Sequence, residues 1–135
     1  MKPYAALAAL FLCACGGSDN QPTSPASASI AGTYHLASIN GNTLPFTYQL
    51  GTTTIVVTSD VLTVADGGTW TESGAYSQTV NGATTNQVMA DGGAWSRLGT
   101  TVSLANANKT ISYAGQFTGS SLNLSNTSFS YVFAR

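Results

Sequence analysis

Charged side chains are scarce in this sequence. Asp, Glu, Lys and Arg make up 7% of the 135 residues, against about a quarter of an average soluble protein. The formal net charge is −1, so the chain has no basic patch that would release counterions from nucleic acid, which excludes a nucleic-acid partner. Without long-range electrostatic steering, a partner must be recognised by shape, by apolar contact or by neutral hydrogen bonds.

Groups for catalysis are scarce as well. His35 is the only histidine, so it is the only side chain whose ordinary pKa lies near neutrality. No nucleophile-elbow pattern is present. Asp60, Asp66 and Asp91 stand beside turn signals, where a short acidic side chain has a structural role. We therefore expect a non-enzymatic protein that needs no cofactor and no metal.

The two cysteines, Cys13 and Cys15, lie at the end of an apolar run without a histidine nearby, so neither a metal pair nor an internal disulfide is expected. Residues 1–14 have one positive charge, then this run, then small residues, which is the pattern of a signal peptide. The run is too short to span a bilayer. We therefore expect residues 1–14 to be removed, which leaves Cys15 as the first residue of the mature chain.

The four residues that end at Cys15 read Leu-Cys-Ala-Cys. They resemble the lipobox of bacterial lipoproteins, with leucine three residues before the modified cysteine and a small residue directly before it. The resemblance implies lipidation of Cys15 with diacylglycerol, an anchor firmer than a single acyl chain. Because glycine rather than aspartate follows, it also implies a place in the cell envelope, in the outer membrane of a two-membrane bacterium. Residues 15–29 are then a flexible linker, since they include two prolines and no large apolar side chain.

From residue 30 onward, apolar residues alternate with polar ones along short runs. This period of two indicates β-strands, and the Asn-Gly, Asp-Gly and Gly-Ser breaks between the runs have the spacing of hairpin turns. We therefore predict an all-β antiparallel domain over residues 30–135, either a barrel or a sandwich. The runs are Tyr34–Ser38, Phe46–Leu50, Ile55–Val57, Leu62–Val64, Tyr76–Val80, Thr85–Met89, Val102–Leu104, Ile111–Tyr113, Leu122–Leu124 and Phe129–Phe133.

One short pattern occurs twice. Residues 65–70 and 90–95 both read Ala-Asp-Gly-Gly, then one variable residue, then tryptophan. We expect each copy to be a hairpin turn, in which the aspartate bonds its own backbone and glycine takes a positive φ. The alternative, calcium bound by Asp66 and Asp91, lacks the further carboxylates that a calcium site needs.

Two motifs at the ends of the domain carry a family resemblance. Gly32-Thr33-Tyr34 resembles the Gly-x-Trp opening of lipocalin-type barrels, with tyrosine in the tryptophan place. The final Arg135 is similar to the basic residue of the closing strand that packs over the first aromatic ring in these barrels. The resemblance implies a single antiparallel meander barrel, lipocalin-like, of about 8–10 short strands and open at one end. It also implies an interior that holds a small apolar or amphipathic molecule.

Aromatic residues dominate the positions expected to face the interior. An eight-stranded barrel is wide enough only to be filled by its side chains or to hold one small ligand, so these residues form either a packed core or the wall of a pocket. The candidate ligand-binding residues are Tyr48, Trp70, Trp95, Tyr113 and Tyr131. The other inward candidates are Tyr34, Phe46, Tyr76, Phe129 and Phe133.

Glu72 and Arg97 are candidates for a charge pair. Each stands two residues after a tryptophan and therefore shares the face of that tryptophan on its strand. A carboxylate on an inward face needs a partner, and the hypothesis is that Glu72 and Arg97 pair across strands or line the barrel mouth. The alternative is two solvated charges at the rim, worth under about 1 kcal/mol together.

The sequence thus predicts a membrane-anchored, non-enzymatic lipoprotein of the cell envelope whose β-barrel binds a small apolar or amphipathic ligand. The alternative is a protein-interaction module of the envelope, such as an inhibitor of a secreted hydrolase or an assembly accessory. A packed interior and an exposed apolar patch favour that alternative.

Overall fold

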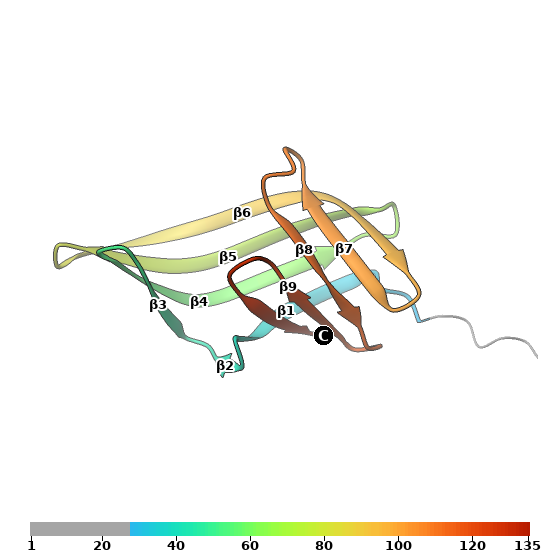
Figure 1. Ribbon diagram of the computed structural model, residues 1–135, viewed down its shortest axis with the longest axis horizontal. Helices are drawn as coiled ribbons and strands as arrows, with labels where there is room; N and C mark the ends of the chain where they lie inside the picture. Colours follow the sequence, from blue (N-terminus) through green and yellow to red (C-terminus); the bar gives the residue numbers. More distant parts are fainter. Residues whose placement is uncertain (1–27) are drawn as a thin grey trace, which may run out of the picture.

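The computed structural model describes residues 28–135, which form ten β-strands joined by loops (Figure 1). The predicted signal peptide, Cys15 and the linker as far as residue 27 lie outside the described residues. None of the described residues forms a helix of the length and hydrophobicity that crossing a bilayer requires. The strands are β1 (Gly32–Ile39), β2 (Asn42–Thr43), β3 (Phe46–Leu50), β4 (Thr53–Val64), β5 (Thr69–Val80), β6 (Ala83–Leu98), β7 (Thr101–Asn106), β8 (Ser112–Phe117), β9 (Ser121–Ser125) and β10 (Ser130–Ala134).

Eight of these strands close into an antiparallel barrel. From β4 to β10, each strand pairs with the next one in the chain, and β1 then closes the barrel by pairing with β10 on one side and with β4 on the other. The short strand β2 pairs with the end of β1, and the short strand β3 pairs with the first half of β4. The predicted all-β meander is therefore confirmed, and the barrel is compatible with the lipocalin-like architecture that the resemblance implies.

Tight Asn-Gly turns set the register of two hairpins. Asn40 and Gly41 have φ angles of 49° and 78°, and Asn81 and Gly82 have φ angles of 50° and 81°. Positive φ at both central residues belongs to the turn that follows the right-handed twist of paired strands, and asparagine followed by glycine adopts it at little cost. The turn predicted at Asn40-Gly41 is confirmed.

An extension projects from one end of the barrel, and its main part is formed by the three longest strands. β4, β5 and β6 are 12, 12 and 16 residues long, and their outer halves run beyond the barrel together with β3, at the left of Figure 1. We call this four-stranded sheet the arm: β3, residues 53–58, residues 74–80 and residues 83–90. On its far side β6 is free until Gly93, where its pairing with β7 begins.

The second Ala-Asp-Gly-Gly copy is part of a strand, so the turn predicted there is wrong. Asp91, Gly92 and Gly93 lie inside β6 and pair with residues 70–72 of β5, whereas the first copy does form the turn between β4 and β5. At Gly93, β6 passes from the arm into the barrel wall and approaches β7 so closely that a Cβ atom would overlap the carbonyl oxygen of Ala105. Glycine is needed here for close approach of two backbones.

One end of the barrel is closed by arginine side chains. The Arg135 guanidinium lies 5.1 Å from the ring centre of Tyr34 and donates hydrogen bonds to three backbone carbonyls, as the lipocalin resemblance implies. Arg97 covers Phe117 at 5.0 Å. Beneath them lies an apolar core whose most deeply buried side chains are Trp70, Tyr34, Phe133, Leu62, Leu104, Leu122 and Val102. The other end, from which the arm projects, is the open end.

Candidate functional site

A cavity of about 100 Å³ lies at the open end of the barrel. Its walls are largely apolar, with five aromatic rings among the lining residues, and its strongest polar features are the carboxyl groups of Asp60 and Glu72. Mostly apolar walls with a few placed polar groups are typical of small-molecule sites. The lining residues are Leu36, Ile39, Phe46, Tyr48, Val57, Asp60, Glu72, Met89, Tyr113, Phe129 and Tyr131.

Asp60 and Glu72 come from neighbouring strands and are both buried, at 5% and 6% exposure. Asp60 pairs with Gly74, two residues beyond Glu72 on β5, and a Cβ at Gly74 would stand only 3.2 Å from Cγ and Oδ1 of Asp60. The glycine therefore leaves room for the carboxyl group. The two carboxyls are close enough for each to affect the pKa of the other, and the Tyr113 hydroxyl donates to Oε2 of Glu72 at 3.4 Å. Oδ1 of Asp60 has no hydrogen-bond partner among the described residues.

Burial governs the ionisation of this pair. Burial, together with the neighbouring Asp60 and Asp91 carboxyls, raises the pKa of Glu72 to about 8, against the opposing effect of the Tyr113 hydroxyl. Burial also raises the pKa of Asp60, against the opposing effect of Glu72. Two carboxyls this close titrate as a unit. At neutral pH the pair therefore retains a proton and has about one negative charge rather than two.

The buried side chain of Asn106 is hydrogen-bonded to Asp91, the third acidic residue of this region. Asn106 is 6% exposed, and its Oδ1 accepts hydrogen bonds from the backbone N–H groups of Thr110 and Ile111 at 2.9 and 3.1 Å. Its Nδ2 donates to Oδ2 of Asp91 at 3.3 Å. Asp91 is the cross-strand partner of Glu72, so this contact fixes a negative charge beside the pair. The inner end of the cavity is electrostatically negative.

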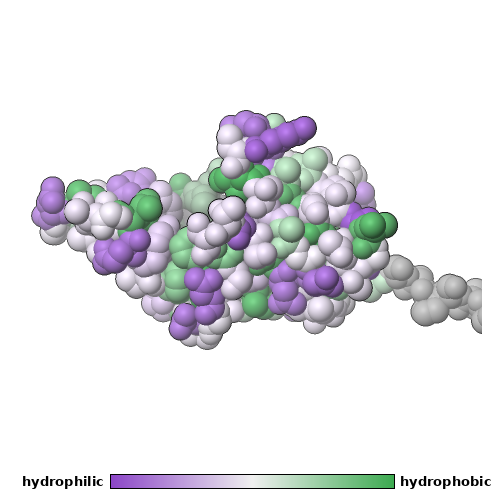
Figure 2. All heavy atoms as spheres, viewed as in Figure 1, coloured by the Kyte–Doolittle hydropathy of each residue, from purple (hydrophilic) through white to green (hydrophobic). Residues whose placement is uncertain are grey.

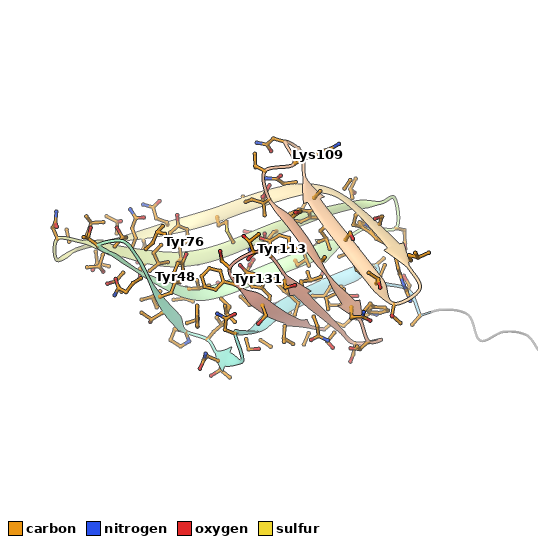
Figure 3. All side chains as sticks on the ribbon, viewed as in Figure 1. Tyr48, Tyr76, Lys109, Tyr113 and Tyr131 are labelled. Atoms are coloured by element: carbon orange, nitrogen blue, oxygen red, sulfur yellow. The ribbon has the colours of Figure 1, made fainter. Side chains whose placement is uncertain are left out.

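The aromatic wall runs from the barrel towards the arm. Tyr113 packs edge-on against Tyr131, with ring centres 5.6 Å apart. Phe129 continues the row and contacts Tyr48 edge-on at 5.0 Å. Figure 3 shows Tyr113 and Tyr131 near the middle of the molecule, with Tyr48 and Tyr76 to their left, towards the arm. Of the predicted ligand-binding residues, Tyr48, Tyr113 and Tyr131 thus lie together on the cavity.

The two tryptophans do not line the cavity. Trp70 is 1% exposed, and its indole N–H is bonded to the carbonyls of Ala94 and Ala105 at 3.1 and 3.2 Å. Trp95 donates to the carbonyl of Ala65 at 2.8 Å. Both therefore pack and bond the barrel wall, with Trp70 edge-on beneath Tyr113 at 6.1 Å.

Glu72 and Arg97 have different partners in the structure. Arg97 lies at the closed end, where it donates to the carbonyls of Gly99 and Ala28 and covers Phe117. The cross-strand partner of Glu72 is Asp91, six residues before Arg97 on the same strand. Glu72 does face inward, as the hypothesis required, but its charge is shared with Asp60.

A larger hollow of about 560 Å³ lies along the inner face of the arm. It shares Tyr48, Val57 and Met89 with the cavity, so the two spaces lie next to each other. Its remaining walls are Leu50, Ile55, Ser59, Gly74, Ala75, Tyr76, Gln78, Val88 and Ala90. The surface in Figure 2 shows apolar residues spread over the face, while strongly hydrophilic colour gathers at loop tips. The site is thus a small acidic cavity beside an uncharged groove.

Sequence reasoning missed Asp60, because it was assigned to a turn. Its alternation with Leu62 and Val64, which are inward-facing and buried, is the signal that identifies it. A separate hollow of about 590 Å³ over β6 to β9 is lined mostly by small neutral residues, with Trp95, Leu104 and Tyr113 among them. It has no acidic or basic group, so it offers fewer polar contacts for a ligand than the acidic cavity.

Within residues 28–135, no three acidic, histidine or cysteine side chains are grouped to hold a metal ion. No family model, no curated protein and no solved structure matches the chain.

Proposed function

We propose that this protein is a non-enzymatic binding protein for a small amphipathic molecule, held on the cell envelope by a lipid on Cys15. The observation that carries the proposal is that the acidic cavity adjoins the uncharged groove of the arm, with which it shares Tyr48, Val57 and Met89. The cavity has the volume of about three water molecules, so it admits only a compact polar head. The groove has room for the apolar remainder of the molecule.

The energetics of this arrangement suit a reversible ligand. Each methylene removed from water contributes about 0.8 kcal/mol, so an eight-carbon chain on the groove gains about 6 kcal/mol before the costs of association. The aromatic wall is built from rings packed against one another, which limits the side-chain entropy lost on binding. Binding therefore costs little further ordering of these side chains.

Replacing Tyr48 with alanine should weaken the binding of an uncharged fluorescent probe, N-phenyl-1-naphthylamine, by about tenfold or more, because Tyr48 belongs to both the cavity and the groove. The measurement is a fluorescence titration of the purified full chain. Thr47→Ala is the matched control, since the neighbouring Thr47 points to the opposite face of β3, and it should leave the affinity unchanged. A wild-type chain that binds neither this probe nor any apolar competitor contradicts the proposal.

The anchor is tested separately. Changing Cys15 to serine should abolish incorporation of labelled fatty acid and move the chain from the membrane fraction to the soluble fraction, because serine has no thiol to receive the diacylglycerol. Cys13→Ser is the control and should change neither result. Continued labelling of the Cys15 variant would show that the lipid is attached at another residue, and an unlabelled wild-type chain would show that it is not lipidated.

One observation favours the alternative, a protein-interaction module. The free edge of β6 in the arm bears exposed Val88 at 76%, and Leu50 on β3 is 65% exposed. An unpaired, uncharged strand edge is a surface for strand addition. The probe titration separates the two functions, because an interaction module with a filled interior binds no apolar probe.

A further inference from the structure

We infer that the polar head of the ligand is a protonated amine with free N–H groups, bound by Asp60 and Glu72 at the inner end of the cavity. This inference rests on the proposed function and names the chemical class of its ligand. It is drawn from the partners, burial and surroundings of the two carboxyl groups.

The first observation is the acceptor that lacks a partner. Asp60 is 95% buried and lines the cavity, and its Oδ1 has no hydrogen-bond partner among the described residues. A buried acceptor left unbonded is costly, and more so when it is charged. The ligand head that fits this place must therefore donate a hydrogen bond, which an ammonium or a hydroxyl group does and a carboxylate does not.

The second observation is the sign of the local charge. Glu72 is close enough to Asp60 to affect its pKa, and Asp91 lies across the strand from Glu72. A fatty-acid carboxylate would be a further negative charge among these three residues. An ammonium instead receives charge-assisted hydrogen bonds, which are about twice as strong as neutral ones. Charge therefore selects an amine over both a carboxylate and an alcohol.

The third observation is that the cations of the described residues are used elsewhere. Arg97 and Arg135 are bonded to backbone carbonyls at the closed end. Lys109 is exposed in the loop between β7 and β8, away from the cavity in Figure 3. Within residues 28–135, therefore, no side chain of the protein takes the position that a ligand cation would occupy.

The aromatic wall adds attraction for a cation. Tyr113, Tyr131 and Phe129 line the same cavity, and the face of an aromatic ring attracts a cation within about 6 Å. A quaternary ammonium would gain this cation–π attraction, but it has no N–H group to donate to Oδ1 of Asp60. A primary amine gains both, and its compact head suits a cavity of about 100 Å³.

Binding of the amine exchanges one cation for another. At neutral pH the carboxyl pair holds a proton. The incoming R–NH₃⁺ displaces this proton, which goes to solvent, and no covalent bond to carbon is made or broken. Affinity for the amine should therefore rise from pH 6 to pH 8, by at most about tenfold per pH unit. The groups that face the pair are Asp91 on β6, Tyr113 on β8 and Tyr131 on β10, and the two tyrosines stay neutral over this range, because burial raises the pKa of each.

The test is calorimetric titration of the full chain with four ligands that share one chain length: octylamine, octanol, octanoate and octyltrimethylammonium. Octylamine should bind about tenfold or more tightly than each of the other three. Titrations in two buffers of different ionisation enthalpy should show one proton released per amine near pH 7. Octanoate or octyltrimethylammonium binding as tightly as octylamine would overturn the inference.

Substitutions of Asp60 and Glu72 test whether these two residues bind the amine. Asp60→Asn and Glu72→Gln should each weaken octylamine about tenfold or more while octanol changes little. Asp66→Asn, which removes the same charge from the exposed turn between β4 and β5, is the matched control and should have no effect. If octanol and octylamine bind equally, the proposed function stands and this inference fails. If none of the four ligands binds, both fail.

Discussion

Gly93→Ala should destabilise the protein by about 3 kcal/mol or more. The added Cβ would overlap the carbonyl oxygen of Ala105 and lie 2.7 Å from Cα of Asn106. Both are backbone atoms of β7 at the point where its pairing with β6 begins. Neither is the mobile end of a flexible side chain, so relief requires the two strands to separate. The measurement is urea unfolding followed by tryptophan fluorescence, since Trp70 and Trp95 flank this position on paired strands.

The control for this prediction comes from the other copy of the same sequence pattern. Gly67 lies in the turn between β4 and β5, and a Cβ there meets nothing within 4 Å. Gly67→Ala should therefore change stability by less than about 0.5 kcal/mol. A Gly93→Ala protein as stable as the wild type would show that β6 and β7 do not approach each other at this register.

The two copies also show the limit of local sequence signals. Aspartate followed by two glycines has the chemistry of a turn, and in residues 66–68 that chemistry decides the structure. In residues 91–93 the same letters permit close backbone approach within a strand of 16 residues. Only the position of β7, which is set by the closure of the whole barrel, distinguishes the two uses. A prediction from one local window cannot contain that information.

Asp60 was missed for a related reason. Alternation counted from Ile55 and Val57 places residue 60 on the outer face, whereas alternation counted back from Leu62 places it inside. The two counts disagree because β4 has an irregularity between Val57 and Ser59 in its pairing with β5, and an extra residue of this kind reverses the faces of a strand. The inner end of the site therefore depends on a bulge that the sequence pattern does not announce.

Features set by a single strand or a single turn were predictable. The all-β class, the runs of alternating residues and the Asn40-Gly41 turn follow from local periodicity and turn chemistry. The packing of Arg135 over Tyr34 followed from the lipocalin resemblance. Tyr48 and Tyr131 were candidates because their strands alternate, but their meeting at one cavity depends on how β3 and β10 are placed around the barrel. The assembly of the site is a property of the closed sheet.

Glu72→Gln should stabilise the protein at pH 8 by about 2–4 kcal/mol and have little effect at pH 5. The pKa of Glu72 rises from an ordinary value of 4.5 to about 8 in the folded protein. Between these values the folded state binds more protons than the unfolded state, so the stability present below pH 4.5 is lost as the pH rises towards 8. Each unit of pKa difference corresponds to about 1.4 kcal/mol. Glutamine has no charge to desolvate, and its amide can donate to the unpartnered Oδ1 of Asp60.

The pH dependence of the free energy of unfolding therefore reports the protonation of the carboxyl pair. Wild-type stability, measured by urea unfolding, should fall between pH 5 and pH 8, with a slope of at most about 1.4 kcal/mol per pH unit from this residue. The raised pKa of Asp60 acts in the same direction, so part of the slope should persist in the Glu72→Gln protein. Asp66→Asn should retain the wild-type slope, since Asp66 is exposed. Equal stability of the wild type at pH 5 and pH 8 would show that Glu72 ionises without loss of solvent. An amine bound as proposed would cancel this trend, because the amine-bound folded state holds the pair ionised, as the unfolded state does at these pH values.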